Sequence, residues 1–91
     1  MKSSEIANVS FSTTKFREGY SMPEVDSFLD KIRRSLAAWE SGQAGVLTAE
    51  EIEAARFSLT KFRAGYDEEQ VDNFLDQAMV ALSSFENDPE P

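Results

Sequence analysis

The chain contains no cysteine and no histidine. Without cysteine it can form neither a disulfide framework nor a thiolate metal site, which is in keeping with a reducing compartment. Without histidine it lacks the commonest general acid–base group and zinc ligand, so most pairs of nucleophile and base are excluded. The sequence therefore disfavours an enzyme, and it predicts no cofactor, no metal and no small-molecule substrate.

Long apolar runs and an excess of basic charge are also missing. No stretch approaches the roughly 20 apolar residues of a membrane span, and the start from Met1 to Glu5 has no apolar run behind it, so no signal peptide is expected. Nine basic and 17 acidic residues give a net charge of −8. This charge opposes binding to nucleic acid, because a phosphate backbone requires a basic face.

An internal repeat organises the 91 residues. Shifting the sequence by 46 residues aligns Phe11–Glu40 with Phe57–Glu86, and 15 of the 30 aligned positions are identical. All ten aromatic residues fall at paired positions, which are Phe11/Phe57, Phe16/Phe62, Tyr20/Tyr66, Phe28/Phe74 and Trp39/Phe85. The chain thus divides into a first repeat at 1–45 with a linker at 41–47, a second repeat at 46–86, and a tail at 87–91 that we expect to be disordered.

Each repeat predicts a short helix, a loop and a longer helix. Ser21 with Glu24 matches the capping box of a helix that should end near Glu40, and acidic residues from Asp67 open a helix that should end near Glu86. The short helices are expected at about 4–9 and 49–56, the second of them after a capping box of Thr48 and Glu51. Gly19 and Gly65 are expected to provide the backbone freedom for the turn into each long helix.

Apolar residues recur at three- and four-residue steps along both long helices and give each helix one stripe. The residues assigned to the core of the helix pair are Val25, Phe28, Leu29, Ile32, Leu36, Trp39, Val71, Phe74 and Leu75. No alternating pattern is long enough to build a sheet. The predicted fold is all-α, with two pseudo-symmetric short helix–loop–long helix units packed as a helical bundle or a short coiled-coil-like pair.

The direction of the helix pair stays open at this point. A helix of 17 residues is about 25 Å long, and the seven residues from Ser41 to Leu47 reach at most about 23 Å. A parallel pair within one chain is therefore barely connectable, with help from the short helix. An antiparallel hairpin, or exchange of a repeat between two chains, is easier.

The motifs of both repeats resemble the N-terminal domain of the bacterial DivIVA family. In the first repeat Phe16–Tyr20 (FREGY) precedes Val25–Asp30 (VDSFLD), and in the second Phe62–Tyr66 (FRAGY) precedes Val71–Asp76 (VDNFLD). Leu47–Ile52 also resembles the opening of that domain. The double occurrence is similar to the short tandem DivIVA-domain proteins of Gram-positive bacteria.

This resemblance implies a non-enzymatic cytoplasmic protein, peripheral to the inner face of the membrane, that recruits other proteins at division sites and cell poles. It further implies a parallel coiled-coil pair whose crossed loops expose a phenylalanine and neighbouring cations to lipid. Carried over to this sequence, those residues are Lys15, Phe16, Arg17, Lys61, Phe62 and Arg63.

The same six residues allow other interpretations. Burial of one phenylalanine contributes up to roughly 1.5–3 kcal/mol, and each cation near an anionic leaflet about 1 kcal/mol, so two loops facing one way would bind a membrane. Alternatively, Phe16 and Phe62 pack on the long helices while Arg17 and Arg63 pair with carboxylates, or the loops form a protein-binding hot spot. Core packing is the simplest of these.

Two pairs of aspartates lie four residues apart, Asp26 with Asp30 and Asp72 with Asp76, and so share a helical face. Four carboxylates are the ligand type that Ca²⁺ prefers. Because no calcium-binding loop or further ligand accompanies them, a solvated face near a helix start is the expected role.

Charge divides unevenly between the repeats: residues 1–45 carry six basic and six acidic residues, whereas residues 46–91 carry three and eleven. Lys31, Arg33 and Arg34 of the first long helix correspond to Gln77, Met79 and Val80 of the second. We therefore expect the repeats to pack on each other within the chain, and an apolar face of the second long helix either to be buried or to bind a partner or a second copy of the chain. This candidate face comprises Ala78, Met79, Val80, Leu82 and Phe85.

The function predicted from the sequence is a protein–protein interaction module related to bacterial division and polarity scaffolds. A peripheral membrane-binding module that uses the two Lys-Phe-Arg loops is the alternative.

Overall fold

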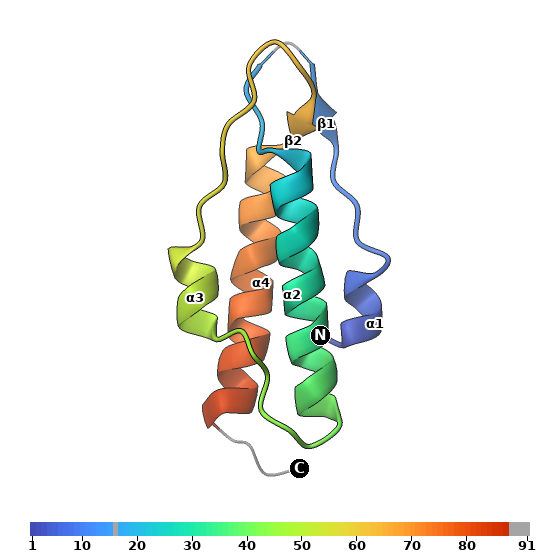
Figure 1. The fold of residues 1–91 in the computed structure, drawn as a ribbon, viewed down its shortest axis with the longest axis vertical. Helices are drawn as coiled ribbons and strands as arrows, with labels where there is room; N and C mark the ends of the chain where they lie inside the picture. The colour runs from blue at the N-terminus through green and yellow to red at the C-terminus, as the bar shows by residue number, and fades with distance from the viewer. Residues whose placement is uncertain (16, 88–91) are drawn as a thin grey trace.

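The computed structural model describes residues 1–15 and 17–87. Within them the chain forms two long helices, two short helices and one small antiparallel ladder (Figure 1). In chain order the elements are α1 (Ser3–Ile6), β1 (Thr13–Thr14), α2 (Met22–Glu40), α3 (Ala49–Ala54), β2 (Gly65–Tyr66) and α4 (Glu68–Asn87). The mainly helical structure expected from the sequence is confirmed. Of the predicted tail, Asn87 closes α4, and the remaining residues lie outside the described part of the chain.

The prediction that no sheet forms was wrong in one place. Strand β1 pairs with β2 in antiparallel register, with Thr13 opposite Tyr66 and Thr14 opposite Gly65. Two strands of two residues each are too short to produce an alternating pattern in the sequence. The ladder arises from a contact between distant segments, which local sequence does not encode.

The helix boundaries follow the predicted capping signals closely. Helix α2 starts directly after Ser21 and ends at Glu40, as expected. At the start of α3, the Thr48 hydroxyl accepts a hydrogen bond from the Glu51 amide at 3.1 Å, and the Thr48 amide donates to the Glu51 carboxylate at 3.2 Å. This reciprocal pair is the predicted capping box. Both short helices are shorter than predicted, because α1 stops at Ile6 and α3 at Ala54.

Helices α2 and α4 lie side by side and run in the same direction, away from the end where the ladder lies (Figure 1). The two long helices therefore form a parallel pair within one molecule. The length of the linker had made this arrangement the hardest to connect. The linker does not span the helix length alone: after α2 the chain returns through α3 and the extended segment 55–64 before it enters α4. That path is several times longer than the linker, which removes the difficulty.

The core fills the space between the two long helices and the short helix beside each. Ile32, Leu36, Val71 and Leu82 are at most 1% exposed. Of the predicted helix-pair core, Val25, Ile32, Leu36, Val71 and Leu75 are buried, and Phe28, Leu29, Trp39 and Phe74 are half-buried and pack against them. Ile6 from α1 and Ile52 from α3 complete this core from outside the helix pair. The short helices are thus held by burial of one isoleucine each.

Truncation of a core leucine should be costly here. We expect Leu82→Ala, at a side chain that is 0% exposed, to lower the free energy of unfolding by about 2–5 kcal/mol, because it removes apolar contacts and leaves a cavity. The matched control is Val80→Ala, two residues away and 65% exposed, which should change stability by about 0.5 kcal/mol or less. Urea unfolding monitored through the single tryptophan, Trp39, measures both. Equal effects of the two substitutions would contradict this placement of the core.

Candidate functional site

Two segments that precede the long helices cross each other near the helix starts. The Tyr20 amide donates to the Tyr66 carbonyl at 2.9 Å, and the Tyr66 amide donates to the Tyr20 carbonyl at 3.0 Å. These two tyrosines are 46 residues apart, so they occupy equivalent positions of the repeat. This pair of hydrogen bonds fixes which residues of the two loops lie opposite each other.

Glycine is required at this crossing for close approach. A Cβ atom on Gly19 would lie 2.7 Å from the Tyr66 carbonyl oxygen, and one on Gly65 would lie 2.9 Å from the Gly19 carbonyl carbon. Neither glycine has a positive φ, which among the described glycines is found at Gly42. The expectation that they serve a turn was therefore wrong: they let two backbones touch.

Each segment also hydrogen-bonds to the first turn of the helix that belongs to the other repeat. The Ser58 amide donates to the Glu24 carboxylate at 3.0 Å, and the Ser12 amide donates to the Gln70 side-chain oxygen at 2.7 Å. The hydrogen bond to Ser58 is the main reason why the pKa of Glu24 is lowered from its usual value. The predicted reciprocal capping box of Ser21 and Glu24 does not form, because Ser21 makes no side-chain cap and the Glu24 carboxylate is engaged across the repeats.

The two tyrosine hydroxyls make a matching pair of contacts beside the crossing. Tyr20 donates to the Asp72 carboxylate at 2.9 Å, and Tyr66 donates to the Asp26 carboxylate at 2.7 Å. Burial, followed by the adjacent Asp72 carboxylate, raises the pKa of Tyr20 to about 12. Asp26 and Asp72 are thus partners of tyrosine rather than a purely solvated face.

Asp30 and Asp76, the other two aspartates of the predicted solvated face, make no contact with a tyrosine hydroxyl among the described residues. Asp30 forms ion pairs with Arg33 at 2.8 Å and Arg34 at 2.9 Å, and it is chiefly the hydrogen bond from Arg33 that lowers the pKa of Asp30. Asp76 is exposed. Within residues 1–15 and 17–87, no group of three or more acidic residues is arranged to hold a metal ion.

Aromatic side chains pack around the crossing in two equivalent sets. Phe11 packs edge-on against Tyr66 and Phe74, at centroid distances of 5.4 and 5.8 Å. The corresponding Phe57 lies 5.3 Å from Tyr20 and 5.6 Å from Phe28. Each phenylalanine comes from one repeat and packs on aromatic residues of the other, which adds about 0.5–1.5 kcal/mol per pair to the area buried.

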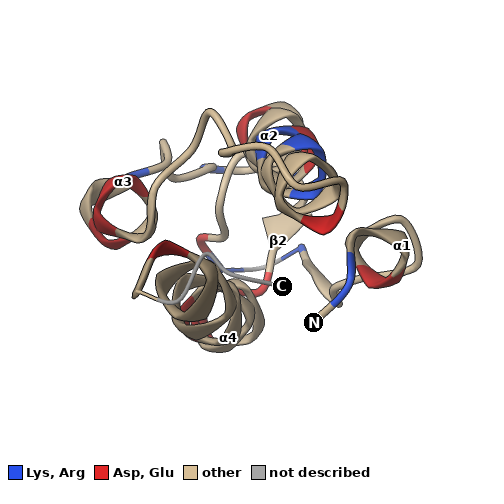
Figure 2. Cartoon of the chain, turned by 90° about the horizontal axis from the view of Figure 1, so that it is seen from below, with Lys and Arg blue, Asp and Glu red and all other residues tan. Residues whose placement is uncertain are grey.

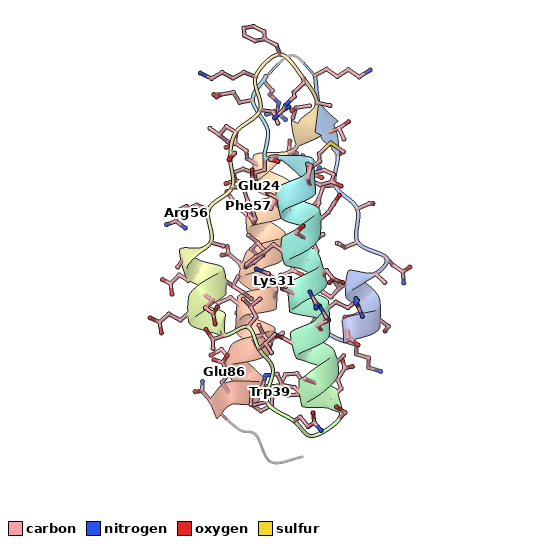
Figure 3. The ribbon with its side chains drawn as sticks, viewed as in Figure 1. Glu24, Lys31, Trp39, Arg56, Phe57 and Glu86 are labelled. Atoms are coloured by element: carbon pink, nitrogen blue, oxygen red, sulfur yellow. The ribbon has the colours of Figure 1, made fainter. Side chains whose placement is uncertain are left out.

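The far ends of the long helices are held in an equivalent way. The Ser3 amide and hydroxyl both donate to the Glu40 carboxylate at 2.7 Å, and the Ala49 amide donates to the Glu86 carboxylate at 2.9 Å. Each final glutamate of a long helix thereby holds the start of the short helix of its own repeat. Trp39 stacks on Phe85 between these ends with an interplanar angle of 9° (Figure 3).

The five described residues of the two Lys-Phe-Arg loops come to the same end of the molecule, beyond the crossing. We call this the loop end and define it by the described residues Lys15, Arg17, Lys61, Phe62 and Arg63; Phe16 lies outside the described part of the chain. Lys15, Arg17, Lys61 and Phe62 line one hollow of about 400 Å³ together with Glu18. The structure therefore brings the two loops together.

Phe62 does not pack on the long helices, so that interpretation was wrong for this residue. Its relative exposure is 104%, and its φ of 61° places a bulky residue in the left-handed region. A non-glycine residue in this conformation costs about 1–3 kcal/mol. Phe62 thus combines an exposed ring with a strained backbone, a combination that folding alone does not favour.

The cations of the loop end are only partly neutralised. Arg17 pairs with Asp67, whose pKa is lowered first by the hydrogen bond from the Gln70 amide and then by this arginine. The position equivalent to Asp67 in the first repeat is Ser21, and among the described residues Arg63 forms no ion pair. Four cations against Glu18 and Asp67 leave this end positive on a chain of net charge −8.

The fold buries some residues of the predicted apolar face of α4 in the core and leaves others at the surface. Ala78 and Leu82 are 0% exposed, so they belong to the core and not to an outer surface. Met79 packs half-buried against that core, as does Phe85. Val80 alone of the five is well exposed, at 65%.

Sequence reasoning missed the polar contacts between the repeats. Four pairs of equivalent polar positions are identical in the two copies and make matching contacts between the repeats, namely Ser12/Ser58, Thr14/Thr60, Tyr20/Tyr66 and Asp26/Asp72. Identity of polar residues between two otherwise diverged copies was the signal that could have found them.

Comparison with known proteins adds no relative: no family model, curated protein or solved structure matches the chain. None of the helices in the described residues is both long and apolar enough to cross a membrane.

The tyrosines should titrate at unusually high pH. Because the folded pKa of Tyr20 is raised from 10.0 to about 12 and that of Tyr66 is raised as well, their contribution to stability is complete below about pH 10. It is lost as the pH rises toward 12. Tyrosinate absorbance on the two tyrosines of the chain measures both ionisations. Asp72→Asn should lower the pKa of Tyr20, and Asp26→Asn that of Tyr66; ordinary values in the wild-type chain would contradict the two contacts.

Proposed function

We propose that this chain is a non-enzymatic interaction module made of two DivIVA-like units that pair about a pseudo-twofold axis, and that its loop end docks on an anionic membrane surface. The pairing is supported by contacts that recur 46 residues apart, both at the crossing and at the aromatic sets around it. The parallel direction of α2 and α4 is also what the resemblance to DivIVA implies. The pairing takes place within one chain instead of between two.

The observation that carries the membrane proposal is Phe62, a fully exposed ring in a strained backbone beside cations from both loops. Insertion of this ring into the lipid interface contributes up to roughly 1.5–3 kcal/mol. Each neighbouring cation adds about 1 kcal/mol at an anionic leaflet. Two loops held at one end by the crossing present these groups as one surface, so neither loop has to be ordered on binding.

The acidic charge of the rest of the chain is compatible with this orientation. The molecule is elongated, with extents of 47 × 23 × 17 Å, and helix α3 with its glutamates lies well below the loop end (Figures 1 and 2). Charges more than about 8 Å apart in solvent are largely screened at physiological ionic strength. A molecule that stands on its loop end keeps most of its carboxylates beyond that distance from the lipid.

A role in bacterial division or polarity machinery at the inner face of the membrane follows from the resemblance to DivIVA and is part of the proposal. In such a role the module holds a partner protein near the membrane and carries out no chemistry.

Vesicle binding tests the proposal directly. Wild-type protein should co-sediment with vesicles that contain phosphatidylglycerol and far less with neutral phosphatidylcholine vesicles. Phe62→Asp should reduce the partition coefficient at least tenfold, because it removes the inserted ring and adds a repelled charge. The control is Val80→Asp, which changes an exposed apolar residue of α4 to the same acid and should bind as the wild type does.

Two results would contradict membrane docking. One is wild-type protein that stays in the supernatant with anionic vesicles at low salt. The other is an equal loss in the Phe62 and Val80 variants, which would show that charge alone and not the loop end governs the association.

A further inference from the structure

A second surface lies along α4, well away from the loop end. Val80 forms the wall shared by two hollows. One of about 550 Å³ lies on the α1 side and is lined by Met1 and Glu5 with Asp76, Gln77 and Ala81. The other, of about 730 Å³, lies on the α3 side and is lined by Ala49, Glu50 and Glu53 with Met79, Ser83, Ser84 and Asn87. We call these two hollows and the Val80 ridge between them the α4 groove.

The rim of the α4 groove is acidic on both sides. Glu5 and Asp76 lie along the first hollow, and Glu50 and Glu53 along the second. Among the residues that the structure describes, no lysine or arginine side chain lines either hollow. The α4 groove thus has an exposed valine, apolar and small residues in its hollows, and carboxylates at its edges. Such a surface is complementary to an apolar side chain that is flanked by cations.

Comparison with the first repeat shows that the α4 groove is specific to the second repeat. The positions equivalent to Gln77, Met79 and Val80 carry Lys31, Arg33 and Arg34, and Figure 2 shows the basic residues on α2 where α4 carries none. Both arginines form ion pairs with Asp30 on the surface of α2. The α4 groove is thus an apolar, acid-rimmed surface on only one of two otherwise similar helices.

The geometry points to a protein partner that places a basic amphipathic helix in the α4 groove, with apolar residues in the two hollows and lysine or arginine side chains toward Glu5, Asp76, Glu50 and Glu53. A helix laid along a groove buries residues at steps of three, four and seven positions. The net charge of −8 speeds the approach of such a segment by electrostatic steering.

The acidic rim also argues against a second copy of the chain or an anionic membrane as the occupant of the α4 groove. Two copies of the chain joined through this groove would bring their rims of carboxylates together, which opposes a homodimer here. An anionic membrane is repelled by the same rim. Because the groove runs beside α4 and the loop end lies beyond the crossing, one molecule can engage a membrane and a basic helix at the same time.

Peptide binding provides the test. The probe is a panel of fluorescently labelled 14-residue helical peptides with leucine at steps of three and four and lysine on both flanks, in several registers. Each has a twin in which glutamate replaces every lysine. At physiological salt, at least one lysine peptide should bind at least tenfold more tightly than its twin by fluorescence anisotropy, and its affinity should fall with added salt.

Matched variants locate the binding. Val80→Asn should weaken the lysine peptide at least tenfold, whereas Val46→Asn, at a linker valine that is 80% exposed and lines neither hollow, should leave the affinity unchanged. Glu50→Gln with Glu53→Gln should weaken binding and reduce its salt dependence. Glu68→Gln with Glu69→Gln removes two carboxylates from the first turn of α4, outside the groove, and should have less than half that effect on the salt dependence.

Several outcomes would overturn the inference. They are the absence of binding by every lysine peptide, equal affinity for a lysine peptide and its glutamate twin, and equal loss in the Val80 and Val46 variants. A homodimer seen by sedimentation that Val80→Asn disrupts would assign the groove to a second copy of the chain and would likewise overturn it.

Discussion

The structure depends on the crossing of two backbones at Tyr20 and Tyr66. The reciprocal amide–carbonyl hydrogen bonds there are possible only because Gly19 and Gly65 carry no side chain at the point of closest approach. Once the backbones cross, Ser12 and Ser58 each reach the first turn of the other repeat's long helix. Each unit therefore supplies hydrogen bonds to the start of the other unit's long helix.

Most of the residues that join the two repeats are the same in both copies, such as the tyrosines and their aspartate partners. Glu24 and Gln70 differ in charge but accept equivalent hydrogen bonds from the other repeat. The outer surfaces differ, with cations along α2 and an apolar, acid-rimmed groove along α4. Both units keep the contacts of the crossing and both form the loop end, whereas the groove proposed for a partner lies on the second unit alone.

The two long helices with their boundaries, the start of α3 and most of the core could be predicted from the sequence, because capping residues such as Thr48 and the apolar stripe through Ile32 and Leu36 act locally. The parallel direction could not, since the reach of the linker alone argued against it and the return path through α3 is a tertiary property. The role of Gly19 and the exposure of Phe62 could not be predicted from the sequence either. Both depend on where a second, distant segment lies.

The central claim is that one chain contains a parallel pair of long helices. Because the chain has no cysteine, spin labels can be placed at will, and double electron–electron resonance on Ser27→Cys with Asn73→Cys and on Ser27→Cys with Ser84→Cys tests this most directly. Positions 73 and 84 are 11 residues apart on α4, or about 16 Å along its axis. With labelled protein diluted in unlabelled protein, the parallel pair predicts a shorter distance from 27 to 73 than from 27 to 84. The reverse order, or a signal lost on dilution, would contradict it.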